Sequence, residues 1–91
     1  MTIHRVKSWG YLFDAIDAGV KKHDVRDMRD REYKVGDILI LERFDQTTGE
    51  YTGETLRCII TYITNRNVCC AFSSAVLDRN FGILSLEKQP K

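Results

Sequence analysis

The strongest constraint on the fold is a run of four apolar residues, Ile38-Leu39-Ile40-Leu41, which follows the expected turn Val35-Gly36-Asp37. Successive side chains of an extended strand point to opposite faces, so both faces of this strand are apolar. Such a strand must be covered on both sides, as in a closed barrel or in a sheet packed under a helix. At 91 residues the chain is expected to form one domain, residues 1–91, with one small core.

A helix is predicted near the start of the chain. Ser8 is the expected N-cap, because its hydroxyl can accept a hydrogen bond from an amide of the first turn. Gly19 is expected to end the helix, since glycine adopts the left-handed conformation without a steric clash. We expect the helix to bury one apolar stripe, which includes Trp9 as a core residue. The stripe consists of Trp9, Leu12, Phe13 and Ile16.

Five or six strands are expected beside the helix. They are residues 3–7, 21–28, 38–41, 56–64, 68–72 and 81–86. In the strand 56–64, Leu56, Cys58, Ile60 and Tyr62 are expected to share one side. Connections after Val35 have the length of hairpin loops, such as the loop 46–53, which favours antiparallel pairing. Together with the helix, these strands predict an α+β fold. We expect a small antiparallel β-barrel of five or six strands with the N-terminal helix packed beside it, and a frayed tail at 87–91.

Composition and missing motifs argue against several functional classes. Lys and Arg number 14 and Asp and Glu 13, so the net charge of +1 gives no general attraction to nucleic acid, although a local basic patch is compatible with it. No apolar run approaches the roughly 20 residues of a membrane span. The three cysteines, Cys58, Cys69 and Cys70, predict free, buried thiols and a cytoplasmic location. The sequence contains no recognisable metal site or cofactor motif, so we expect neither a metal nor a cofactor.

Charged residues are dense between positions 21 and 37. If the first part of this segment is extended, Asp24 and Arg26 lie on one face of it, close to Lys21. A lysine, a carboxylate and a guanidinium held together present donors and acceptors to an anionic or planar polar ligand. The alternative is a set of surface ion pairs, each worth only about 0–1 kcal/mol.

The residues Gly19-Val20-Lys21-Lys22-His23-Asp24-Val25-Arg26 resemble the G-x-K-x-x-E-x-R signature of the ASCH domain family, within the PUA-like superfamily. Asp24 replaces the usual Glu. Residues 30–41 resemble the D-R-x-F/Y-x-V-G-D-x-L stretch of a small bacterial and phage subgroup. Residues 4–7, 50–53 and 61–63 continue the similarity, so it covers nearly the whole chain.

The resemblance implies a PUA-like barrel with a cleft beside the helix, in which RNA or a nucleotide binds. Lys21, Asp24 and Arg26 would line that cleft. Some relatives are amidohydrolases that remove an acyl group from a modified cytidine with a Lys, a Thr and a Glu. Lys21 matches the Lys, Asp24 stands in place of the Thr, and no position matches the Glu. The resemblance therefore leaves it open whether the chain is an enzyme.

Three functions follow from these observations. The first is RNA or nucleotide binding, in which a basic flank holds phosphate and an aromatic ring stacks on a base. Its ligand-binding residues would be Lys21, Asp24, Arg26, Lys22, Arg29, Arg31 and Tyr51. The second is an amidohydrolase acting on an acyl-modified nucleoside such as N4-acetylcytidine, with Lys21 and Asp24 catalytic. The third is a phage-type adaptor that binds a host protein.

Overall fold

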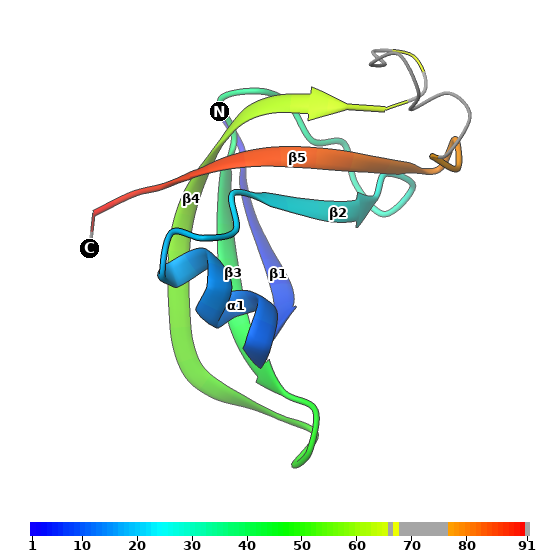
Figure 1. Cartoon of the computed structure of the whole chain (residues 1–91). Helices are drawn as coiled ribbons and strands as arrows, with labels where there is room; N and C mark the ends of the chain where they lie inside the picture. The colour runs from blue at the N-terminus through cyan, green and yellow to red at the C-terminus, as the bar shows by residue number, and fades with distance from the viewer. Residues whose placement is uncertain (66, 68–76, 91) are drawn as a thin grey trace.

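The computed structural model describes residues 1–65, 67 and 77–90. Within these residues five strands and one helix follow one another, and the strands form one curled sheet, shaped as a half-barrel, with α1 packed on its concave side (Figure 1). The elements are β1 (Ile3–Trp9), α1 (Gly10–Asp17), β2 (His23–Asp27), β3 (Ile38–Asp45), β4 (Glu50–Thr64) and β5 (Phe81–Lys88). The α+β class is confirmed. The strand expected at 68–72 lies outside the described residues.

The sheet has the order β1-β3-β4-β5-β2, so β1 and β2 are its two outer strands. The pairs β3–β4, β4–β5 and β5–β2 are antiparallel, but β1 runs parallel to β3, from Ile3 opposite Ile38 to Trp9 opposite Phe44. The expectation of a wholly antiparallel barrel is therefore wrong for β1. Helix α1 and strand β2 form the long crossover that a parallel pair requires. Among the described strands no ladder joins β1 to β2, and this opening in the half-barrel is called the seam below.

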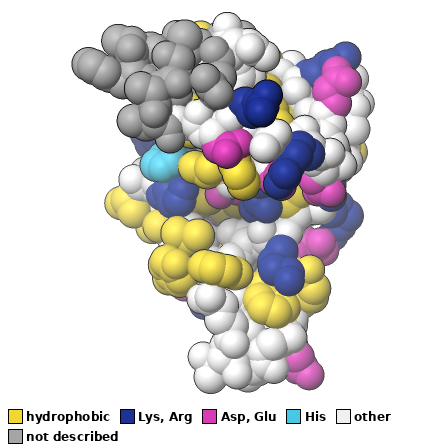
Figure 2. Space-filling view, turned by 90° about the vertical axis from the view of Figure 1, so that its right-hand side faces the viewer, with side chains coloured by type: hydrophobic (Ala, Val, Ile, Leu, Met, Phe, Trp, Pro, Cys, Tyr) yellow, Lys and Arg dark blue, Asp and Glu magenta, His cyan; other side chains and the backbone are white. Residues whose placement is uncertain are grey.

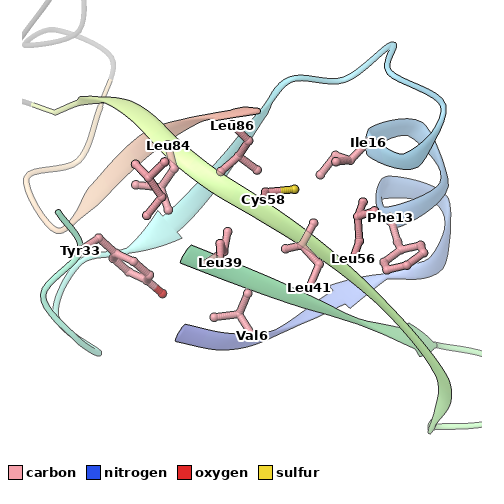
Figure 3. Close-up of a cluster of buried hydrophobic side chains, with 11 residues drawn as sticks. Val6, Phe13, Ile16, Tyr33, Leu39, Leu41, Leu56, Cys58, Leu84 and Leu86 are labelled. Atoms are coloured by element: carbon pink, nitrogen blue, oxygen red, sulfur yellow. The ribbon is translucent and has the colours of Figure 1, made fainter. Parts of the chain in front are cut away.

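The core lies between the concave face of the sheet and α1 (Figure 3). Leu39 and Leu41 are fully buried and Ile38 nearly so, as the apolar run predicts, whereas Ile40 is only partly buried. Burial of each such side chain contributes about 1.5–3 kcal/mol. The core cluster consists of Val6, Phe13, Ile16, Tyr33, Leu39, Leu41, Leu56, Cys58, Ile60, Leu84 and Leu86. The cluster thus draws on every strand except β2, whose inward residue Asp24 is polar.

The helix begins later than expected, because β1 continues through Ser8 to Trp9. Ser8 is a buried strand residue and makes no side-chain cap. The strand alternation turns Trp9 to the opposite side, where 45% of the residue is exposed, so the prediction that Trp9 is a core residue is wrong. Phe13 is buried as predicted, and Gly19 follows the helix with the predicted positive φ of 80°.

Strand β4 is longer than expected and contains an irregularity. Its pairing with β5 shifts between Ile60 and Tyr62, which reverses the alternation of side chains beyond that point. Tyr62 is therefore 54% exposed, and Ile63 packs against the core in its place. Placing Tyr62 on the same side as Ile60 was wrong for this reason.

Two expected boundaries also differ. The hairpin between β3 and β4 occupies only residues 46–49, so Tyr51 lies in a strand and not in a loop. Strand β5 includes Glu87 and Lys88, so regular structure extends two residues into the expected tail. Beyond the strand, the Gln89 amide donates to the carbonyl of Arg57 at 2.8 Å.

Candidate functional site

Two arginine side chains bridge the seam between the outer strands. Arg26 on β2 donates from Nη2 to the carbonyl of Lys7 on β1 at 2.8 Å. Arg31 donates from Nη1 to the carbonyl of Arg5, also on β1, at 3.3 Å. Carbonyls on the free edge of an outer strand have no partner strand, so these guanidinium groups donate the hydrogen bonds that a neighbouring strand would otherwise supply. The seam is closed by side chains where backbone pairing ends.

Asp24 and Arg26 form a close pair at the seam. They are two residues apart on β2 and thus share a face of the strand. Arg26 Nε lies 2.8 Å and Nη2 2.7 Å from Asp24 Oδ2, and only 7% of Asp24 is exposed. A carboxylate this buried requires a charged partner, and the planar guanidinium fixes its orientation. The prediction that these two residues lie together is confirmed.

The pair opens into a cleft of about 310 Å³, called the seam cleft below. The seam cleft is lined by Lys7, Ser8, Trp9, Leu12, Asp24, Val25 and Arg26. The face on which β1 and β2 end carries basic and acidic side chains among hydrophobic ones (Figure 2). Trp9 adds an aromatic residue to the lining, and Asp24 and Arg26 supply an acceptor and donors. This volume is at the lower end of the range for small-ligand sites, roughly 300–1,000 Å³.

A sequence model described as "Domain of unknown function (DUF3850)" matches residues 3–82, from the first residue of β1 into β5. The chain belongs to the DUF3850 family. No curated protein matches the chain. The matched segment of this DUF3850 domain contains both outer strands, and hence every residue that lines the seam cleft.

Lys21 does not join Asp24 and Arg26 in this DUF3850 domain. Its ammonium group donates to the carbonyl of His23, and it lines a separate hollow together with Lys22. The expected convergence of Lys21, Asp24 and Arg26 on one cavity is thus found only for Asp24 and Arg26. The strand alternation was inferred correctly, but β2 begins at His23, so Lys21 precedes the strand.

The remaining predicted site residues do not line the seam cleft. Arg29 pairs with Asp27 at 2.7 Å on the surface, and its hydrogen bonds lower the pKa of Asp27 to about 2. Arg31 pairs with Asp30 at 3.2 Å. Both arginines thus form the surface ion pairs of the alternative interpretation, and Arg31 in addition bridges the seam. Tyr51 is exposed near the β3–β4 hairpin and packs edge-on against Phe44, with ring centroids 5.2 Å apart.

Sequence reasoning missed five residues of the cleft: Lys7, Ser8, Trp9, Leu12 and Val25. Trp9 was assigned to the helix stripe because its spacing to Leu12 fits a helix. In the structure the alternation of exposed and buried residues along β1 continues to Trp9 and turns it outward.

Two further expectations concern metals and membranes. Among the described residues, no group of three His, Cys, Asp or Glu side chains is placed to hold a metal ion. No helix in the described part of the DUF3850 domain is long and apolar enough to cross a membrane.

Proposed function

We propose that this DUF3850 domain binds single-stranded RNA or a nucleotide, with one base in the seam cleft. The observation that carries the proposal is the Asp24–Arg26 pair beside the exposed indole of Trp9 in one cavity. Bases are flat, and their edges carry donors and acceptors. A cleft with a flat aromatic wall and a fixed carboxylate–guanidinium pair matches both properties.

Each residue has a defined role in this proposal. Trp9 stacks on the base, a contact worth roughly 1–3 kcal/mol. Asp24 accepts from an amino or imino group of the base, and Arg26 donates from a nitrogen that Asp24 and the Lys7 carbonyl do not use. The cleft favours an unpaired base, because about 310 Å³ does not admit a duplex.

The proposal includes the fold relationship that the resemblance implies. A curled five-stranded half-barrel with one helix on its concave side is compatible with a PUA-like domain of the ASCH type. In this proposal the seam cleft corresponds to the ligand cleft of that family. Asp24 and Arg26 then match two positions of the G-x-K-x-x-E-x-R signature.

Hydrolysis of an acyl-modified nucleoside is the weaker proposal. It requires Lys21 near the substrate, but Lys21 lines a different hollow from the one that Asp24 lines. A phage-type adaptor role has no specific support among the described residues. The hydrolase remains an outcome of the test below.

Calorimetric titration with short single-stranded RNA and with nucleoside monophosphates tests the proposal. We expect saturable binding, weakened about fivefold or more by Trp9→Ala through the loss of stacking. Tyr62→Ala is the matched control, because it removes a similarly exposed aromatic ring that does not line the cleft. Equal affinities for the two variants, or no binding by the wild type, would refute the proposal. Release of acetate from N4-acetylcytidine in the same samples would support the hydrolase instead.

A further inference from the structure

A second hollow lies at the other end of β2, beside the C-terminal end of α1. Its volume is about 130 Å³, and it shares no lining residue with the seam cleft. We call it the lysine hollow; it is lined by Ile16, Gly19, Lys21, Lys22, Leu86, Glu87 and Lys88. Ile16 and Leu86 belong to the buried core cluster and give the hollow an apolar floor.

Two of the three lysines are held in place by hydrogen bonds. The ammonium of Lys21 donates to the carbonyl of His23. Lys88 donates to the carbonyl of Asp17 at 2.8 Å and pairs with its carboxylate at 2.9 Å. Within the described residues, the side chain of Lys22 makes no hydrogen bond or ion pair. Since an ammonium group has three donors, Lys21 and Lys22 retain donors for a ligand.

The charges at the lysine hollow favour an anion. Asp17 offsets the charge of Lys88, which leaves Lys21 and Lys22 against the single carboxylate of Glu87. The carbonyl that holds Lys21 is neutral and does not cancel its charge. The hollow has less than half the volume of the seam cleft, so it suits a compact group better than a base.

We infer that the lysine hollow binds a backbone phosphate of the RNA whose base occupies the seam cleft; this inference rests on the proposed function. Lys22 and Arg26 are four residues apart along an extended segment, which places them about 13 Å apart. A few nucleotides of a single strand cover that distance. The preferred ligand is therefore a short single-stranded RNA, held at both ends of β2, and not a free mononucleotide.

The dependence of affinity on RNA length and salt tests the inference. Uridine monophosphate and oligouridylates of increasing length are titrated into the wild type, Lys22→Ala and Lys34→Ala at several salt concentrations. Lys34→Ala is the matched control, because Lys34 is an exposed lysine that pairs with Glu32 and lines neither cavity.

We expect the wild type to bind oligomers more tightly than the monophosphate. Lys22→Ala should weaken oligomer binding about three- to tenfold, and should reduce the slope of log affinity against log salt by about 0.7. The same variant should leave monophosphate binding unchanged, and Glu87→Gln should strengthen oligomer binding. Equal affinity for monomer and oligomer, or equal salt slopes for Lys22→Ala and Lys34→Ala, would overturn the inference.

A second measurement separates failure of the inference from failure of the proposed function. Inorganic phosphate is added to isotope-labelled protein while amide resonances are followed by NMR. Shifts confined to Lys22 and Leu86, and absent in Lys22→Ala, support a phosphate site in the lysine hollow even if no RNA binds; the seam-cleft proposal would then fall alone. If RNA binds but phosphate does not shift these amide resonances, the inference about the lysine hollow is overturned and the seam-cleft proposal stands.

Discussion

The guanidinium of Arg26 lies 2.8 Å from the backbone carbonyl of Lys7 and joins the two outer strands across the seam. The same guanidinium pairs with the buried carboxylate of Asp24. Arg26 is thus one of the two side chains that bridge the seam, and it also lines the seam cleft. Stability and the shape of the candidate site depend on the same residue.

Removal of the Arg26 side chain should destabilise the fold strongly. Arg26→Ala leaves the carboxylate of Asp24 buried without its cation, a loss that costs roughly 3–5 kcal/mol for a fully buried pair and about 2–4 kcal/mol at this partly exposed one. Urea unfolding followed by circular dichroism measures the change. Arg29→Ala is the control, because the Arg29–Asp27 pair is exposed and its loss should cost less than about 1 kcal/mol. Similar losses for the two variants would contradict this account of the seam.

The His4–Asp37 pair should make the protein sensitive to acid. His4 Nε2 lies 2.8 Å from Asp37 Oδ2, and both residues are buried. Burial alone would raise the pKa of Asp37, but hydrogen bonds from His4 and from the amides of Thr2 and Lys34 outweigh burial, so the pKa lies below its ordinary value. A lowered pKa in the folded state means that this contribution to stability is complete above the unfolded pKa of about 3.9. It is lost as the pH falls through the folded pKa.

Unfolding free energies measured from neutral pH down to about pH 2 test this contribution. The wild type should lose stability as the pH falls below about 4, and Asp37→Asn should be less stable at neutral pH but lose less on acidification. Asp27→Asn serves as the comparison, since Asp27 also has a lowered pKa but pairs on the surface. If the unfolding free energy of Asp37→Asn falls as steeply on acidification as that of the wild type, the role assigned to the pair is refuted.

Cys58 should be unreactive in the folded protein. Its side chain is fully buried in the core, and burial raises the pKa of its thiol to about 11. Alkylating reagents attack the thiolate, which is scarce at such a pKa. Alkylation at pH 8 followed by peptide mass spectrometry should label Cys58 only when urea is present. Equal labelling rates with and without urea would show that the core is open at this strand.

Much of the sheet could be predicted from the sequence because its apolar residues repeat with strict periods. In the run Ile38–Leu41 all residues but the partly buried Ile40 are buried, and Phe13 and Ile16 face the core from α1. Periodicity does not indicate where a strand passes directly into a helix, as β1 does at Trp9. It also does not reveal the shift in pairing that turns Tyr62 outward, because that shift depends on the partner strand β5.

The candidate site was predictable only in part for a similar reason. Asp24 and Arg26 are close in sequence and share a strand face, so local geometry brings them together. Lys7 and Trp9 reach the same cleft because β1 and β2 are the outer strands of a curled sheet. That arrangement is set by long-range pairing and leaves no local signal in the chain. The separation of Lys21 from Asp24 likewise depends on where β2 begins.

The intrinsic fluorescence of Trp9 tests the central claim most directly, because Trp9 is the only tryptophan in the chain and lines the seam cleft. Short single-stranded RNA is titrated into the wild type, with emission followed alongside an independent binding signal from a labelled RNA. The account predicts quenching that saturates together with the binding signal, since a stacked base contacts the indole. Binding that leaves the emission of Trp9 unchanged, or the absence of binding at low salt, would contradict it.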